Sequence, residues 1–147
     1  MTSLWDPQAQ AELARRVACL TPDARPLWGR MTCPQMVVHV TDALALYLGE
    51  LQAGTKHSPL CYPPLKQMVI YLLPIPRNVP TARELKARVA GEWTDELAAL
   101  RAALTRFSSA SKRTDWPAHP LFGRMSCRAY GVLAYKHTDH HLRQFGV

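Results

Sequence analysis

Residues 126–145 of the 147-residue chain, SCRAYGVLAYKHTDHHLRQF, carry clear helix signals. Ser126 is a hydroxyl residue of the kind that caps helix N-termini, and Met125 before it is placed to form a hydrophobic staple. These signals predict a helix over 126–144. His137 and His141 are four residues apart in this helix, so both rings fall on one face, about one turn from each other.

Two earlier segments begin with similar signals. An aspartate–proline pair at 6–7 is an N-cap followed by a first-turn proline, and it predicts a helix over 7–20. Thr32 and the glutamine three positions later form a capping-box pattern ahead of a second helix over 33–51. Gly54 follows that helix as its expected stop signal.

The middle of the chain adds a short helix over 65–73 and a long helix over 81–107. Gly91 in the long helix costs about 1 kcal/mol relative to alanine but need not end it. No segment shows the alternation of a β-strand. The sequence therefore predicts an all-α fold, an up-and-down four-helix bundle with an additional short helix, formed by a single domain over 1–147.

One motif occurs twice in the chain. LWGRMTC at 27–33 returns as LFGRMSC at 121–127, and each copy leads into a predicted helix through a hydroxyl N-cap. Two helix starts that solve the same capping problem explain the repeat. The alternative is that both helices enter the bundle in related ways, about a pseudo-twofold axis.

The composition indicates a globular domain that needs no disulfides. Hydrophobic residues make up 48% and charged residues 20% of the chain, which are ordinary proportions. The cysteines form no CxxC pair, which argues against a zinc ribbon and a secreted disulfide scaffold. Reduced thiols are expected at all four positions, Cys19, Cys33, Cys61 and Cys127. Cys33 and Cys127 precede helices whose dipole can lower a thiol pKa, but packing roles are expected for both.

Charge and hydropathy limit the expected partners and location. The formal net charge is +7, and most of the surplus lies within 101–147 as single charges rather than a run. No nucleic-acid motif accompanies them, so nucleic acid is not an expected partner. The most apolar run, 68–76, is shorter than the roughly 20 residues of a membrane span. No signal-peptide pattern opens the sequence, so a cytoplasmic protein without membrane contact is expected.

A third histidine makes the pair on the last helix more informative. His39 lies in the middle of an apolar helical segment, MVVHVTDAL. A lone histidine there is usually satisfied within the core, but a second helix that also presents histidines favours a shared metal site, because bundle interiors commonly hold metals. Three neutral imidazoles with open positions are typical of a catalytic metal site. His39, His137 and His141 are therefore the predicted ligands of one divalent metal ion.

Three neighbouring residues are expected to support these ligands. Asp42 is about one turn after His39 and Asp139 lies near the pair, so either can accept a ring N–H and fix its tautomer. Solvated acidic side chains are an equally good interpretation of both. His140 points roughly 100° away from His141 around the helix, and is expected to be a supporting or surface residue. A ligand role beside His137 is its alternative.

Other candidate residues are less specific. His57 and His119 lie in proline-rich loops and look incidental. Tyr47 and Tyr135 are the obvious candidates for a general acid or base on the two histidine-bearing helices. No catalytic residue is assigned.

Two stretches resemble the DinB-like superfamily of metal-binding four-helix bundles: WGRMTCPQMVVHVTDAL at 28–44 and HPLFGRMSCRAYGVLAYKHTDHHLRQFG at 119–146. The second is more specific, with HPLFG, a capped helix and then HxxxH. The resemblance covers most of the chain and is closest to small subgroups of uncharacterised function. It implies the same three ligands, His39, His137 and His141, around nickel, zinc or iron in a solvent-open site. It also implies a homodimer.

The resemblance further implies a reaction class. Characterised members include thiol-dependent S-transferases and a maleylpyruvate isomerase, which use glutathione, bacillithiol or mycothiol. A metal-dependent thiol S-transferase-like enzyme acting on a small molecule is therefore expected, with the thiol sulfur on the metal and its carboxylate held by Arg143 or Lys136. A non-enzymatic metal-binding or stress-related protein, or a hydrolase that uses metal-bound water, are the alternatives.

Overall fold

Residues 1–52, 54, 58–77 and 88–147 are described by the structure, a computed structural model. This part of the chain is all-helical, and its only β interaction is an isolated bridge between His119 and Gly123. The long helices are α1 (Pro7–Val17), α2 (Cys33–Leu48), α4 (Trp93–Ser109) and α5 (Cys127–Gln144). Shorter turns lie between α2 and α4, namely η1 (Pro59–Cys61), α3 (Leu65–Gln67) and the π-helical η2 (Met68–Leu72).

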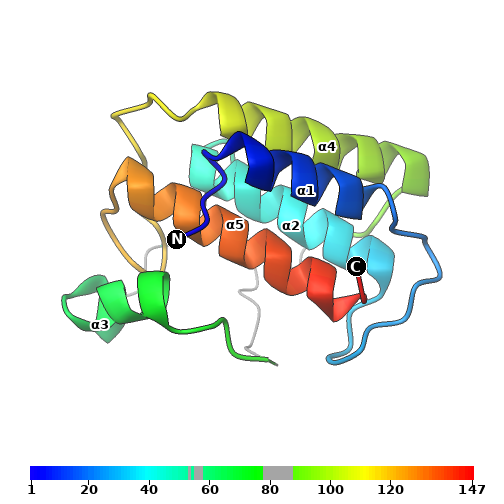
Figure 1. The fold of residues 1–147 in the computed structure, drawn as a ribbon, viewed down its shortest axis with the longest axis horizontal. Helices are drawn as coiled ribbons and strands as arrows, with labels where there is room; N and C mark the ends of the chain where they lie inside the picture. Colours follow the sequence, from blue (N-terminus) through cyan, green and yellow to red (C-terminus); the bar gives the residue numbers. More distant parts are fainter. Residues whose placement is uncertain (53, 55–57, 78–87) are drawn as a thin grey trace.

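The long helices pack side by side, but not in the predicted alternating order. α1 and α5 run in one direction, and α2 and α4 run in the other (Figure 1). Arg106 late in α4 pairs with Glu50 just after α2, as expected for parallel neighbours. The segment between α2 and α4 returns the chain to the end at which α2 began. The predicted up-and-down connectivity is therefore wrong, because this long crossover replaces a tight turn.

The helix starts match their sequence signals. The Asp6 side chain accepts a hydrogen bond from Gln8 N at 3.0 Å at the start of α1. Thr32 and Gln35 form the complete capping box at the start of α2. The Ser126 side chain accepts from Ala129 N at 3.2 Å at the start of α5. The predicted short helix over 65–73 is confirmed as the continuous pair α3 and η2.

Some helix ends differ from the prediction. α2 ends at Gly49, not at Gly54, because Gly49 adopts the left-handed conformation (φ 80°) that terminates helices. The predicted long helix over 81–107 begins only at Trp93, and its predicted start at 81–87 lies outside the described residues. The Glu96 carboxylate accepts hydrogen bonds from Arg88 (2.6 Å) and Gly91 N (2.9 Å), which hold the chain before α4 across its first turn.

The repeated motif has a backbone explanation. Gly29 has φ 82° and Gly123 has φ 63°, both in the left-handed region that side chains disfavour. Each glycine stands three residues before a hydroxyl N-cap, Thr32 or Ser126. The two copies therefore build the same turn ahead of α2 and α5.

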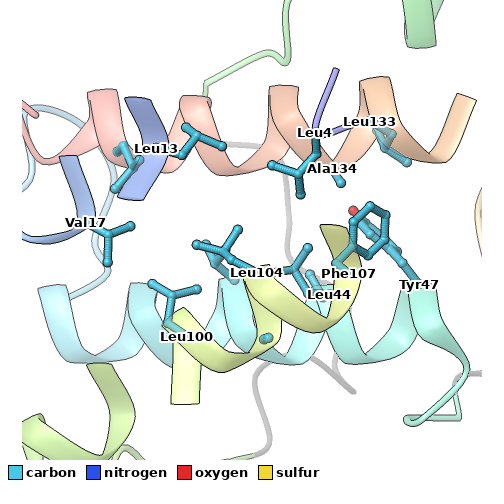
Figure 2. Close-up of a cluster of buried hydrophobic side chains, with 14 of the residues drawn as sticks. Leu4, Leu13, Val17, Leu44, Tyr47, Leu100, Leu104, Phe107, Leu133 and Ala134 are labelled. Atoms are coloured by element: carbon cyan, nitrogen blue, oxygen red, sulfur yellow. The ribbon is translucent and has the colours of Figure 1, made fainter. Parts of the chain in front are cut away.

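The core fills the space between the four long helices (Figure 2). Each helix contributes side chains with almost no exposure, among them Leu13, Val17, Leu44, Leu100, Phe107 and Ala134. Trp5 stacks on Phe107 with ring centroids 4.9 Å apart, which joins the start of the chain to the end of α4. In the described part of the chain, no helix combines the length and apolar character needed to cross a membrane.

Candidate metal centre

Three histidine rings meet between α2 and α5. His39 comes from α2, and His137 and His141 come from successive turns of α5. Their ring centroids lie 4.7 to 5.0 Å apart, and one ligand-capable atom from each ring lies within 4.8 Å of the others. The structure therefore brings together the three residues predicted as ligands.

The packing of the two helices explains the cluster. α2 and α5 are antiparallel neighbours, so the middle of α2 faces the second half of α5. His39 is only 5% exposed and His141 8% exposed. Burial lowers the pKa of His141 to about 3, with a further contribution from His39. Burial, followed by the charges of His141 and His39, lowers the pKa of His137 well below 6.5. Both rings on α5 are therefore neutral at neutral pH, as metal ligands must be.

The spacing of the rings fits one transition-metal ion. His39 Nε2 and His137 Nε2 are 3.1 Å apart. Two nitrogens that each lie about 2.0–2.1 Å from an ion, at tetrahedral or octahedral angles, are roughly 2.9–3.4 Å apart. The observed separation falls in this range, so these two rings need little movement to share an ion.

Gln144 orients the third ring. Its amide Nε2 donates to the carbonyl of Trp28 at 2.8 Å, so its Oε1 must face His141 Nδ1, also at 2.8 Å. Because Oε1 is an acceptor, His141 carries its proton on Nδ1 and leaves the Nε2 lone pair for a metal. The sequence analysis missed this residue. Its spacing, three positions after His141 on the same helix, was the available signal.

The two aspartates predicted to orient histidines have other partners. Asp42 pairs with Arg88 at 3.4 Å. Asp139 pairs with Arg16 at 2.8 Å and with Arg143 at 3.0 Å. Their expected role is corrected accordingly, because arginines from other segments take up these carboxylates, and Gln144 supplies the acceptor for His141.

His140 lies beside the cluster rather than in it. Its ring packs edge-on against His141, with centroids 5.2 Å apart, and against Trp28 at 5.6 Å. The guanidinium group of Arg77 lies 4.3 Å from the centre of the Trp28 ring. His39, rather than His140, therefore lies next to His137, and a supporting role for His140 stays a prediction.

Two cationic residues expected to bind a ligand carboxylate are engaged elsewhere. Lys136 Nζ donates to three main-chain carbonyls of the η2 region, those of Val69, Ile70 and Leu73, at 2.6 to 2.9 Å. Arg143 is held by Asp139. Tyr135 also points away from the cluster, because its hydroxyl reaches Glu12 of α1 at 3.5 Å.

The cysteines differ in burial, and none of the four forms a disulfide: Cys33 is buried, Cys61 and Cys127 are partly buried, and Cys19 is exposed. Cys33 is buried at the start of α2, and burial, with a smaller effect of Asp23, raises its pKa to about 11. Cys127 donates to the carbonyl of Ser111 at 3.1 Å. A buried thiol with a raised pKa is a poor nucleophile, so Cys33 is not a catalytic candidate.

His119, which looked incidental in the sequence, lies beside Tyr47, the general acid or base candidate on α2. The two ring centroids are 5.4 Å apart, and Tyr47 also lies 6.3 Å from the ring of His137. Burial lowers the pKa of His119 to about 4. Position in a proline-rich loop gave no hint of this placement, which depends on the packing of that loop against α2.

The class of this protein is defined by its fold and its histidine cluster alone, without support from a known relative. No family model, curated protein or solved structure matches the chain. The described residues form an all-helical protein in which two antiparallel helices hold a cluster of three histidines, with His39 and His141 buried and His137 partly exposed. Membership of the DinB-like superfamily stays an expectation from the sequence.

Proposed function

We propose that the protein binds one divalent transition-metal ion through His39, His137 and His141, and that it uses the remaining coordination positions to bind and activate a small thiol. The carrying observation is the histidine cluster itself, with two ring nitrogens 3.1 Å apart and a third ring oriented by Gln144. Imidazole donors suit zinc, nickel and iron rather than magnesium or calcium. Three protein ligands leave at least one position open.

The surroundings of the cluster favour a thiol over an activated water. A bound divalent ion lowers the pKa of a coordinated thiol or water. Hydrolysis commonly also needs a general base, but the nearby carboxylates of Asp42 and Asp139 are held by arginines. A thiol needs less assistance, because its ordinary pKa of about 8.5 is already close to neutral pH. Together with the resemblance to the DinB-like superfamily, this supports an S-transferase-like reaction on a small molecule.

Metal content tests the first part of the proposal. Tag-free protein is expected to contain about one equivalent of metal by elemental analysis, and His39→Ala and His137→Ala are expected to contain little. His140→Ala is the matched control, because it removes a neighbouring ring that lies outside the cluster. Parent protein that takes up neither nickel nor zinc would overturn the proposal, as would a His140→Ala variant that loses metal like the others.

Absorption spectroscopy tests whether a small thiol binds to the metal ion. Protein loaded with Co²⁺ is expected to develop a near-ultraviolet sulfur-to-metal band when glutathione, bacillithiol or mycothiol is added. The band should be missing in His39→Ala. If cobalt binds but no thiol changes the spectrum, the protein binds metal without activating thiols, and the non-enzymatic alternative is favoured.

A further inference from the structure

Tyr47 presents a hydroxyl group beside the candidate metal centre. The residue is 5% exposed and packs against Phe107, Tyr130 and His137. In the same cluster the Tyr130 hydroxyl donates to Pro117 O at 2.8 Å. The Tyr47 hydroxyl makes no hydrogen bond to any residue that the structure describes. A tyrosine hydroxyl has an ordinary pKa of about 10, so its oxygen keeps the proton at neutral pH and can act as a donor.

His119 presents a second donor, and the loop around it fixes its tautomer. His119 Nδ1 accepts hydrogen bonds from Leu121 N at 3.1 Å and Phe122 N at 3.2 Å. An acceptor nitrogen carries no proton, so the neutral ring carries it on Nε2. This N–H group also lacks a hydrogen-bond partner within the described ranges.

The two donors belong to one wall of the centre. Tyr47 contacts both His119 and the predicted ligand His137, with ring centroids 5.4 and 6.3 Å away. Tyr47 is almost fully buried and His119 is partly buried, and neither donor is used by another described residue, so both are available to an acceptor that arrives with a ligand. Both groups can donate, and the His119 Nε2–H group can only donate, so the pair suits an oxygen acceptor.

We infer that Tyr47 and His119 form the specificity-determining wall of the metal centre, and that they donate hydrogen bonds to a carboxylate or carbonyl oxygen of a metal-bound ligand. The inference rests on the proposed metal binding and adds the part of the ligand that the protein recognises. The sulfur or another atom occupies the metal, and an oxygen acceptor lies toward α2 and the loop that contains His119. This wall takes the role that Lys136 and Arg143 cannot fill, because those side chains are engaged elsewhere.

Two small thiols separate the contribution of the sulfur–metal bond from that of the hydrogen bonds to an oxygen acceptor. Mercaptoacetate offers a sulfur and a carboxylate, whereas ethanethiol offers only the sulfur. Cobalt-loaded parent protein is titrated with each, and the sulfur-to-metal band reports binding. The parent is expected to bind mercaptoacetate more tightly than ethanethiol.

Two variants remove one donor each. Tyr47→Phe deletes only the hydroxyl. His119→Asn keeps an acceptor for Leu121 N and Phe122 N but lacks the Nε2–H donor. Each variant is expected to weaken mercaptoacetate binding about five- to tenfold, as the loss of one hydrogen bond implies, and to leave ethanethiol binding unchanged. Tyr130→Phe is the control, because its hydroxyl is already used by Pro117.

The outcomes are distinguishable. Cobalt content is measured first, and a parent that binds no cobalt overturns the proposed metal site and this inference with it. If all variants hold cobalt equally and bind mercaptoacetate like the parent, the inference alone is overturned. Should His119→Asn fail to fold, Tyr47→Phe decides the result, because removing a hydroxyl without a partner leaves the packing in place.

Discussion

At the scale of single residues, the hydrogen-bond chain from Trp28 through Gln144 to His141 is the most direct control on the metal centre. It begins at a main-chain carbonyl, which can only accept, and so sets the direction of every bond that follows. The tautomer of His141 therefore depends on a side chain that does not itself touch the metal.

Gln144→Leu is expected to weaken metal binding by roughly 10- to 100-fold, because His141 loses the acceptor that orients its ring and fixes its proton. Competition with a chromophoric chelator measures the affinity. Gln8→Leu changes an exposed glutamine to the same residue and should have no effect. Equal affinities in the parent and in Gln144→Leu would contradict the orienting role.

The protonation of His119 should make the stability of the protein depend on pH. Burial lowers its pKa to about 4 from the ordinary value of 6.5. As the pH falls below 6.5, the unfolded chain takes up a proton that the folded ring accepts only near pH 4, so the free energy of unfolding decreases across this window. The full effect amounts to about 3 kcal/mol.

His119→Asn should therefore lose less stability than the parent between about pH 7 and about pH 4.5. Urea denaturation of the metal-free proteins at both pH values measures the two differences. The other buried histidines contribute equally to both proteins and cancel in the comparison. Identical losses would show that His119 titrates normally in the folded protein.

At the scale of elements, two lysines fasten the crossover segment to the rest of the fold. Lys66 of α3 donates to the carbonyls of Phe122 and Arg124, at 3.2 and 2.7 Å. Lys136 of α5 donates in the other direction, to carbonyls at the end of η2. Within α3 and η2, Ile70 is the one buried side chain. These hydrogen bonds are therefore a large part of what holds it in place.

Lys136→Met should loosen α3 and η2 without unfolding the protein. Three carbonyls lose a charged donor, and hydrogen bonds to charged groups contribute about 1.5–3 kcal/mol each. Backbone amides over 65–73 are expected to exchange with solvent at least about tenfold faster. Lys112→Met, an exposed lysine in the loop after α4, is the control. Unchanged exchange over 65–73 would show that packing alone holds the segment.

The helix starts were predictable from sequence and the helix connectivity was not. Thr32 and Ser126 act within a few residues of themselves, so their capping roles can be identified from the sequence alone. The late start of α4 depends on Glu96 binding Arg88 and Gly91 N, a choice among several possible partners. The parallel arrangement of α2 and α4 depends on the path of a long crossover, for which no local signal exists.

The candidate metal centre was likewise predictable only where local sequence spacing determines it. His137 and His141 share a face by spacing alone, and His39 could be added because bundles bury such residues. The partners of Asp42 and Asp139 could not be predicted, because Arg88 and Arg16 approach from other segments. His119 was missed for the same reason.

At the scale of the whole molecule, a bound metal ion would connect two antiparallel helices through their side chains. Because only the folded state assembles all three ligands, binding stabilises it by about 2.7 kcal/mol at a free metal concentration one hundred times Kd. For a chain of this size that corresponds to a rise in Tm of roughly 5–10 °C. Thermal unfolding with zinc or nickel should show this rise in the parent and not in His39→Ala.

His39 and His137 are separated by 98 positions in the chain, and the crossover between η2 and α4 lies between them. Cutting the chain in that crossover would leave one fragment with one of the three clustered histidines and the other with two. Neither fragment alone could reproduce the coordination of the intact centre. The colour of bound cobalt would then report reassembly of the two pieces, which makes the centre a built-in sensor for fragment complementation that needs no attached dye.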